Sequence, residues 1–472
     1  MAFTPWAFLL DFCWMGLLLC IGKILRAKLK VIQSLYLPSS IVAGLLGLIF
    51  GSQFLNLIPF SDQLLRYPAL LVILLFASFP FSSPAFQSPK TVIHKAGSMF
   101  FFNMGAEIGM FGISLLLGAG ILSLFFPDVR PAFTLLMPTG FVGGHGYAAA
   151  VAAELQSEFG FDGALTIGYT FATVGIVSSV VMGIPLIKWA AAKGITRFIT
   201  DVGGLPQSMR TGLIPPEERG SLGTQTISPS SLDPLTFHLM LILIATLGGH
   251  YVAVFSGYAT GKVFHEHLLV PHVATAMICG LILKRIMNLL HMGDAYIDRQ
   301  VMTRIGSSIT DFLVGFGIAS LQLSVVLTYI RPLIIMCILG WVINLVYLFY
   351  FAPRMNPVFW FERGIFTFGW CTGMIAMGIA LLRIVDPDYD SRTQEEYGLA
   401  YIFISPVEIL MISFLPMVVG LGYIWPTALV LTGAFIVIMI LSKVCGYWSS
   451  HYPFVGTREG EDDYQRQTLE QN

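Results

Sequence analysis

Long apolar segments recur along nearly the whole chain of 472 residues. A helix of about 20 apolar residues crosses the hydrocarbon core of a bilayer. The composition agrees, because 56% of the residues are hydrophobic and only 11% are charged, which is too little polar surface for a water-soluble globule. We therefore predict an all-α polytopic membrane protein. A formal net charge of -1 without a compact basic patch argues against a nucleic-acid partner.

The apolar segments form two groups of five on either side of a polar stretch, and one further segment follows. They lie near residues 5–22, 36–57, 67–82, 97–126, 163–187, 236–258, 268–290, 305–329, 331–352, 398–420 and 426–446. The stretch between the groups is rich in Pro, Ser, Thr and Gly, which is typical of a linker. We divide the chain into a first repeat at 1–190, a cytoplasmic linker at 191–234, a second repeat at 235–423, an additional transmembrane helix at 424–447 and a polar C-terminal tail at 448–472.

Two glycine-rich breaks interrupt this apolar chain, Gly143-Gly144-His145-Gly146 and Gly369-Trp370-Cys371-Thr372-Gly373. At membrane depth, backbone leaves the helix only where protein or a wet cavity satisfies its polar groups. We interpret the breaks as the tips of two re-entrant hairpins, at about 133–155 and 364–382. The two tips are predicted to meet at a binding site.

A weak internal repeat supports an inverted duplication. Pro38 and Gly47 match Pro271 and Gly280 at one offset, since 271 − 38 and 280 − 47 are equal. An odd number of spans precedes the linker, so the second repeat starts with the opposite orientation. Inverted repeats with paired broken segments are typical of secondary transporters.

Basic residues that flank the predicted spans set the orientation. Lys23, Arg26, Lys28, Lys30, Lys188, Lys193 and Arg197 fall on one side of the membrane. Because Lys and Arg are concentrated in cytoplasmic loops, we expect this side to be the cytoplasm. The linker and the C-terminus then lie inside and the N-terminus lies outside, in a multi-pass protein of the inner (plasma) membrane.

The hairpin tips supply the predicted substrate-binding residues. The glycines around His145 allow sharp turns and leave backbone N–H groups free to face an anion; the alternative is a close helix contact with a satisfied histidine. Trp370 either walls the cavity or belongs to an interfacial aromatic belt. The predicted set is Gly143, Gly144, His145, Gly146, Gly369, Trp370, Cys371, Thr372 and Gly373.

Three carboxylates lie inside apolar spans, Glu107, Asp311 and Glu408. A carboxylate at membrane depth has to face a cavity, bind a cation, pair or be protonated. Glu408 follows Pro406, whose kink would free carbonyl groups that join it around Na⁺. Asp311 is equally well placed as an interfacial residue, and we treat Asp11 as interfacial. We therefore count Glu107, Asp311 and Glu408 as coupling-ion candidates. The 6 cysteines show no ligand spacing, so neither a disulfide framework nor a metal other than Na⁺ is indicated.

These motifs together resemble the sodium/glutamate symporter family. The resemblance rests on Leu37-Pro38 leading to Val42-Ala43-Gly44-Leu45, on the stretch 143–147, and on Phe171-Ala172-Thr173-Val174-Gly175, and it covers most of residues 10–425. It implies two inverted units of five helices, each with a re-entrant hairpin, a homodimer, and coupling to Na⁺. It also adds Thr173 to the coupling-ion candidates.

The chain departs from the family pattern at three places. The second hairpin lacks the Thr-Pro-Thr run that the resemblance leads us to expect, Glu408 stands where a small residue is expected, and the segment near 426–446 is an addition. All three places lie in the last quarter of the chain.

The sequence therefore predicts sodium-coupled symport of a small organic anion, such as glutamate or a related acidic amino acid or carboxylate. We expect Na⁺ as the coupling ion and no cofactor. A proton-coupled transporter or an exporter of another organic anion is the alternative within this class. From other classes, an intramembrane enzyme lacks a local motif that pairs a nucleophile with a base, and a non-transporting receptor has only the large linker in its favour. We expect no enzymatic activity.

Overall fold

The computed structural model describes residues 4–34, 37–82, 89–198, 211–264, 270–387 and 389–448. Within these ranges every regular element is a helix. Nine of the described helices are long and apolar enough to cross a membrane. The predicted all-helical membrane protein is thereby confirmed.

The helices of the first half follow the predicted spans closely. They are α1 (Pro5–Lys28), α2 (Lys30–Ser34), α3 (Ser39–Phe50), η1 (Leu64–Arg66), α4 (Tyr67–Ser82), α5 (Pro89–Phe125), α6 (Phe133–Ser157) and α7 (Ala164–Ala192). Pro38 precedes α3 as its N-cap, and Gly51 ends it. The predicted span at 36–57 is therefore too long, because the chain after Gly51 turns through Asn56, whose φ is 49°.

In the second half, the helices are more often interrupted. They are η3 (Pro216–Glu218), α9 (Pro234–Phe264), α10 (His272–Leu289), α11 (Gly293–Tyr296), α12 (Arg299–Ala319), α13 (Leu323–Thr328), α14 (Ile330–Val346), the π-helical η4 (Tyr347–Phe351), α15 (Ala352–Met355), α16 (Trp360–Thr372), α17 (Ile375–Val385), α18 (Thr393–Gly420) and α19 (Ile424–Val444). The predicted span at 305–329 is divided, since α12 begins after its N-cap Asp298, six residues earlier than predicted, and ends at Ala319.

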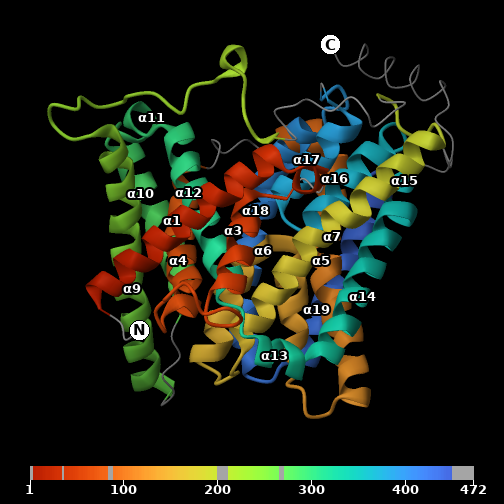
Figure 1. Cartoon of the computed structure of the whole chain (residues 1–472). Coiled ribbons are helices and arrows are strands. Elements are labelled where there is room, and N and C mark those ends of the chain that lie inside the picture. Colours follow the sequence, from red (N-terminus) through yellow and green to blue (C-terminus); the bar gives the residue numbers. More distant parts are fainter. Residues whose placement is uncertain are drawn as a thin grey trace.

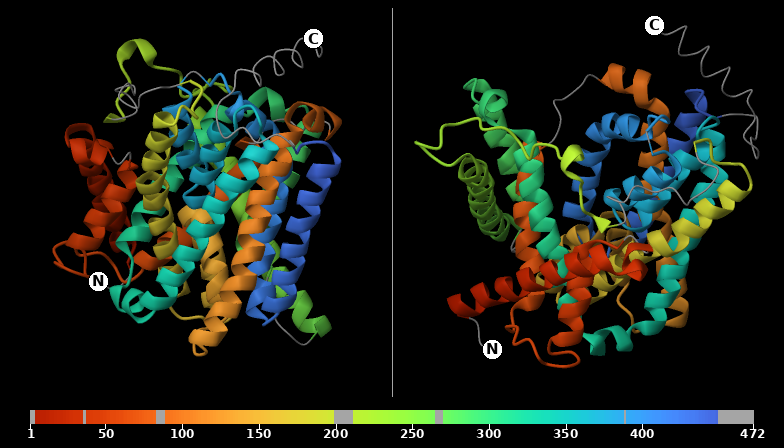
Figure 2. Two further views of the ribbon diagram at one scale, coloured as in Figure 1. Left: turned by 90° about the vertical axis from the view of Figure 1, so that its right-hand side faces the viewer. Right: turned by 45° about the horizontal axis from the view of Figure 1, so that its top comes forward.

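The helices pack as two bundles, and each half of the chain contributes to both (Figure 1). The first bundle contains α1, α3 and α4 together with α9, α10 and α12. The second bundle contains α5, α6 and α7 together with α14, α16, α17, α18 and α19. The bundles touch where α4 and α12 pack against α6. The right-hand view of Figure 2 shows the two bundles side by side from a second direction, whereas in the left-hand view the second bundle lies in front.

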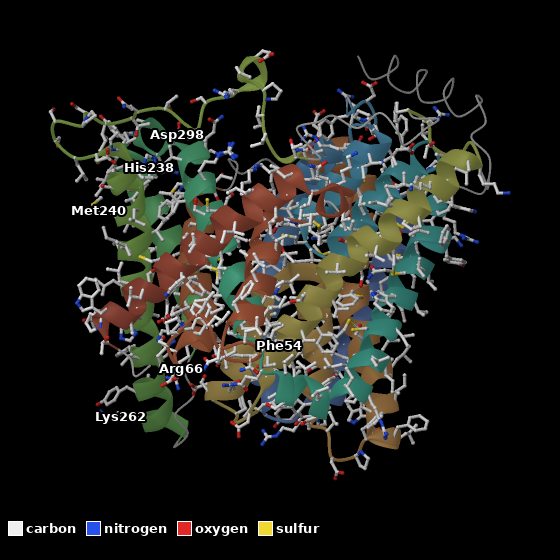
Figure 3. The ribbon with its side chains drawn as sticks, in the orientation of Figure 1. Phe54, Arg66, His238, Met240, Lys262 and Asp298 are labelled. Atoms are coloured by element: carbon white, nitrogen blue, oxygen red, sulfur yellow. The ribbon has the colours of Figure 1, made fainter. Side chains whose placement is uncertain are left out.

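The linker is fixed to the first bundle at one end of the molecule. The backbone N–H of Thr224 donates to Asp298 Oδ2 at 2.9 Å, and the Thr226 hydroxyl donates to the Tyr296 carbonyl at 2.6 Å. The N–H of Asp298 in turn donates to Nε2 of His238 at 2.8 Å. Figure 3 shows His238 and Asp298 close together at this end, opposite to Lys262.

Asp11 lies inside the first bundle and not at its edge. Its Oδ1 accepts from the Ser61 N–H at 2.9 Å, and its Oδ2 accepts from the Tyr67 hydroxyl at 2.6 Å and from the Ser61 hydroxyl. We expected an interfacial residue, and the structure encloses the carboxyl group, because Ser61 in the loop after α3 supplies two donors and Tyr67 of α4 supplies the third. Asp11 joins α1 to the start of α4.

Candidate functional site

Helix α6 is broken at Gly144. This glycine has φ 59° and ψ -150°, in a region that only glycine adopts readily. The two ends of α6 lie together, since Nη1 of Arg130, before the helix, donates to the carbonyl of Phe159, after it, at 2.8 Å. The break therefore lies between two flanking segments that are in contact with each other.

The second glycine-rich break separates α16 from α17. Helix α16 ends at Thr372, Gly373 follows as its C-cap, and α17 begins at Ile375. The two helices approach closely, because a Cβ atom on Gly369 would lie 2.9 Å from the Cα of Gly378. Glycine at both positions is what allows this approach.

The two breaks meet inside the second bundle. A Cβ atom on Gly144 would lie 3.1 Å from the carbonyl oxygen of Gly373. Helix α7 completes the junction, since a Cβ atom on Gly175 would lie 2.3 Å from the carbonyl oxygen of Thr372. The absence of side chains on these glycines thus allows three backbone segments to contact each other at one point.

His145 lies beside this junction and is 1% exposed. Its Nε2 is 3.1 Å from the Thr173 hydroxyl oxygen, and that hydroxyl also donates to the Tyr169 carbonyl at 2.7 Å. A hydroxyl has one hydrogen to donate, so Nε2 of His145 donates to Thr173. The opposite nitrogen, Nδ1, is then an acceptor, and it is buried without a hydrogen-bond partner.

Two of the predicted carboxylates, Glu107 on α5 and Glu408 on α18, face each other behind the junction. They are 0% and 1% exposed, their helices pack against each other, and they lie close enough for a charge on one to act on the other. The Tyr401 hydroxyl donates to Oε2 of Glu408 at 2.8 Å, and Tyr147 of α6 also hydrogen-bonds to this carboxyl group. Neither oxygen of Glu107 has a hydrogen-bond partner.

Cys371 and Trp370, at the second break, lie next to this carboxyl pair. Cys371 interacts with both carboxylates, and its carbonyl accepts from Nδ2 of Asn344 at 3.1 Å. Trp370 is 0% exposed and packs against Tyr397, with ring centroids 5.5 Å apart. The interfacial-belt alternative for Trp370 was wrong, because the side chain is enclosed by α16 and α18.

Asp311 is not part of this cluster. It lies in the first bundle and lines a pocket of about 440 Å³ together with Lys23, Arg26, Ser40 and Ser308. Gly146 faces Leu75 of α4, where a Cβ atom would lie 3.7 Å from Leu75 Cδ2. In the structure, Asp311 of the predicted coupling-ion residues and Gly146 of the predicted substrate-binding residues therefore lie away from the junction.

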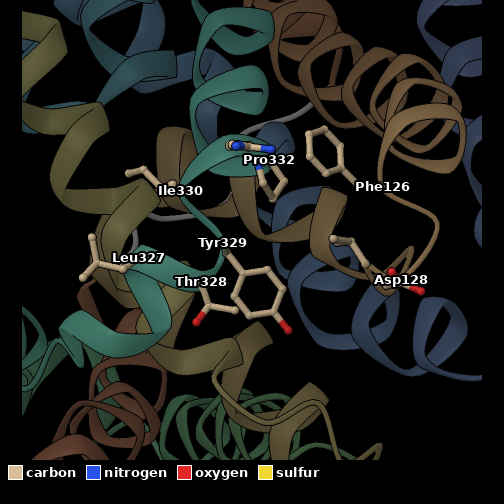
Figure 4. A pocket seen from close by; sticks show the side chains of 9 residues that line it. Phe126, Asp128, Leu327, Thr328, Tyr329, Ile330 and Pro332 are labelled. Carbon is tan, nitrogen blue, oxygen red and sulfur yellow. The ribbon is translucent and has the colours of Figure 1, made fainter.

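A second surface pocket, of about 570 Å³, lies between the α5–α6 connection and the start of α14 (Figure 4). Phe126 and Asp128 line one side, and the stretch 327–332 lines the other. It contains none of the predicted site residues. The candidate site is therefore the buried junction and not this surface pocket.

Near the linker end of α16, charged side chains join the elements of the second bundle. Nη2 of Arg363 lies 2.8 Å from Oε1 of Glu396 on α18, and both side chains are largely buried. The neighbouring Glu362 accepts from the backbone N–H of Arg197, after α7, at 2.8 Å. These contacts fix the start of α16 to α18 and to the chain after α7.

Oxygen atoms at the junction fit a hard monovalent cation. The last carbonyls of a helix have no partner within it, which makes those of Thr372 and Gly373 available where α7 and the break of α6 approach them. Na⁺ takes such oxygen ligands. Among the described residues, no group of three or more His, Cys, Asp and Glu side chains could hold a metal ion, so this chemistry is that of carbonyl and hydroxyl oxygens.

Sequence reasoning missed the tyrosines of the carboxyl pair. Tyr401 precedes Glu408 by two helical turns, and Tyr397 precedes Tyr401 by one, so spacing on α18 places all three on one face. Tyr147 follows the Gly-Gly-His-Gly stretch directly. These positions were visible in the sequence, but only the fold shows that both helices turn them toward Glu107.

Comparisons with known proteins give the family of the chain. A search of curated protein sequences finds no significant match. The sequence profile described as sodium/glutamate symporter matches residues 8–356, so most of α1 and all of α2 to α15 lie within the match and α16 to α19 lie beyond it. The profile covers well over half of the chain, and the chain therefore belongs to the sodium/glutamate symporter family.

Proposed function

We propose that this chain transports glutamate or a related acidic amino acid or carboxylate together with Na⁺, and that the substrate binds where the breaks of α6 and α16–α17 meet. The observation that carries the proposal is the contact between Gly144 and Gly373. A contact between two non-helical segments at membrane depth provides free backbone groups for a polar ligand.

Four features support the interpretation of the breaks as re-entrant hairpins in inverted repeats. Residues before and after α6 hydrogen-bond to each other, and α16 packs against α17 along its length. Pro38 and Pro271, which match in the sequence repeat, are both N-caps, of α3 and α10, with φ values of -54° and -52°. The first three long helices of each half, α1, α3 and α4 and then α9, α10 and α12, together form the first bundle.

The junction offers complementary groups to both ligands. Backbone N–H groups at the break of α6 suit a carboxylate, and the free Nδ1 acceptor of His145 suits the ammonium group of an amino acid. The carbonyls of Thr372 and Gly373, with the Thr173 hydroxyl, suit Na⁺. In this proposal the Na⁺ ligands are junction atoms and not the carboxyl pair.

We further propose that the two bundles move relative to each other during transport, in a homodimer embedded in the inner (plasma) membrane. The linker end carries Lys188 near the end of α7 and Lys193 and Arg197 after it, which supports a cytoplasmic location for the linker. The same orientation puts the start of α1 outside and the end of α19 inside.

The test is uptake of radiolabelled L-glutamate into proteoliposomes that contain the purified protein. Uptake driven by an inward Na⁺ gradient, and absent when choline replaces Na⁺, is expected. L-Aspartate and succinate in the same assay define the substrate class. Uptake that is indifferent to Na⁺, or the absence of uptake for every acidic substrate, would contradict the proposal.

A further inference from the structure

The carboxyl pair of Glu107 and Glu408 needs an explanation of its own. Both side chains are fully buried, and they interact with each other across α5 and α18. Two negative charges that face each other in a low-dielectric interior repel strongly and lose their hydration. The arrangement is therefore stable only if something positive neutralises at least one of them.

No positively charged group of the described chain does so. The titratable groups that interact with the pair are Tyr147 from α6, Cys371 from α16, and Tyr397 and Tyr401 from α18. From the α14 side, Tyr347 faces Cys371 and donates to the carbonyl of Phe102. Helix α19 covers another face of α5 with apolar Phe435 and Met439. His145 points to Thr173 on α7.

Polar atoms around the pair are left without partners. Both oxygens of Glu107, the Nε1 of Trp370 and the hydroxyl of Tyr397 are buried without a hydrogen-bond partner. Tyr397 interacts with both carboxylates, and the Trp370 ring packs on the Tyr397 ring. Such unpaired groups are costly unless a ligand or water satisfies them. They mark a site and not only a packing contact.

We propose that Glu107 and Glu408 form a proton-binding site that couples transport to pH, in addition to Na⁺. A proton needs no coordination shell, whereas a metal cation takes about six oxygen ligands. Among the described residues, no group of three or more His, Cys, Asp and Glu side chains could hold a metal ion, whereas a proton needs only one carboxylate.

The hydrogen bonds indicate which carboxyl group holds the proton. Glu408 accepts from Tyr401 and Tyr147, and such donors stabilise a carboxylate. Glu107 accepts from no donor, so it is the carboxylic acid of the pair. When Glu107 releases its proton to water, both groups are charged, and the repulsion pushes α5 and α18 apart.

The pair is directly connected to the substrate junction. Tyr147 lies two residues after His145 on α6, and Cys371 lies one residue before Thr372 on α16. Both residues interact with the carboxyl pair. A change in the charge of the pair thus acts on the two segments whose ends meet at Gly144 and Gly373.

Infrared spectroscopy tests the protonated carboxyl group without any substrate. The purified full-length protein should show the C=O stretch of a carboxylic acid at neutral pH, with a shift in D₂O. Glu107→Gln should lose one component of this band, because other buried carboxyl groups also contribute to it, whereas Glu158→Gln, at an exposed glutamate, should leave the band unchanged. Tyr401→Phe keeps both carboxyl groups and should shift the pH range in which the band disappears.

Three results would overturn the proposal. The first is an unchanged carboxylic-acid band in Glu107→Gln. The second is a wild-type protein without the band. The third is a wild-type protein that binds ²²Na⁺ with one ion lost in Glu107→Gln, which would make the pair a Na⁺ site. If Glu107→Gln does not fold, the response of Tyr401→Phe decides between these outcomes.

The link to transport rests on the proposed function and is tested in proteoliposomes. A pH-sensitive dye inside the vesicles should report acidification during Na⁺-driven L-glutamate uptake, and Glu107→Gln should abolish that signal while Glu158→Gln retains it. Na⁺-driven uptake without acidification overturns the coupling and leaves the proposed function intact. A wild-type protein without any uptake contradicts the proposed function, and the infrared result alone then decides whether the proton site exists.

Discussion

The carbonyl oxygen of Gly373 lies 3.1 Å from the position that a Cβ atom on Gly144 would occupy. The two glycines belong to different halves of the chain, and each lies at a break between helical segments. Their contact closes the second bundle at the point where His145, Thr372 and Thr173 gather. The predictions below follow from this contact and from the groups that position it.

Gly144→Ala should reduce Na⁺-driven uptake by about tenfold or more, which corresponds to about 1.4 kcal/mol. The methyl group would press on the Gly373 carbonyl, and alanine is strained at φ 59°. Gly160→Ala is the matched control, because Gly160 has φ 58° but no atom within 4 Å of an added Cβ. It should cost about 1 kcal/mol of stability and leave uptake unchanged. Equal losses of uptake in both variants would attribute the effect to strain alone.

Thr173→Val should weaken substrate binding by about tenfold, because a buried Nε2–H of His145 without an acceptor costs about 1–3 kcal/mol. Thr170→Val serves as the control. Its hydroxyl donates only to the Thr166 carbonyl one turn away, at 2.7 Å, on the same helix. Binding measured by thermal stabilisation with L-glutamate should separate the two. If both valine variants bind L-glutamate equally well, the hydrogen bond from His145 to Thr173 does not contribute to substrate binding.

Arg363→Gln should destabilise the protein by about 3 kcal/mol, since it leaves the largely buried Glu396 without its partner. The double variant Arg363→Gln/Glu396→Gln should recover part of that loss, because neither charge is then left unpaired. The melting temperature of the purified protein measures both effects. A double variant as unstable as the sum of the two single variants would show that the pair is not coupled.

The linker anchor at Asp298 should fail in acid. Burial raises the pKa of Asp298, but hydrogen bonds from the Thr224 hydroxyl and from the N–H groups of Val301 and Thr224 outweigh this and lower it overall. The anchor therefore contributes its full stability above the ordinary aspartate pKa of about 3.9 and loses it as the pH falls through the lower folded value.

Limited proteolysis with pepsin measures this loss. Cleavage of the wild-type linker should accelerate only below about pH 4, whereas Asp298→Ala should be cleaved readily above it, because the cap of α12 is also lost, at about 1 kcal/mol. Asp233→Ala is the control, since Asp233 accepts only from the local N–H groups of Leu235 and Thr236 at the start of α9. If Asp298→Ala resists pepsin like the wild type, Asp298 does not anchor the linker.

Much of the architecture could be predicted because the bilayer imposes helix lengths on the sequence. The apolar runs correctly predicted the all-helical membrane protein, and the Gly-Gly-His-Gly and Phe-Ala-Thr stretches led to the family that the profile match shows. The span boundaries were wrong where glycine or a capping residue acted locally, as at Gly51 and Asp298.

The composition of the candidate site was harder to predict, because it depends on contacts between distant segments. Asp311, Glu107 and Glu408 look alike in the sequence, but only the last two face each other. Asp11 looked interfacial because its partners, Ser61 and Tyr67, come from a loop and a helix that follow much later. The re-entrant hairpins, the inverted repeats and the site residues stay predictions that function has to test.

The most direct measurement is the melting temperature of the purified protein with and without L-glutamate, in NaCl and in choline chloride. A ligand that binds only the native state stabilises it, and at a hundred times its Kd the gain is about 2.7 kcal/mol. Our account predicts that L-glutamate raises the melting temperature of the wild type and of Gly160→Ala in NaCl alone, and does not raise that of Gly144→Ala. Equal stabilisation in choline chloride, or of Gly144→Ala, would contradict a Na⁺-dependent site at the contact of Gly144 and Gly373.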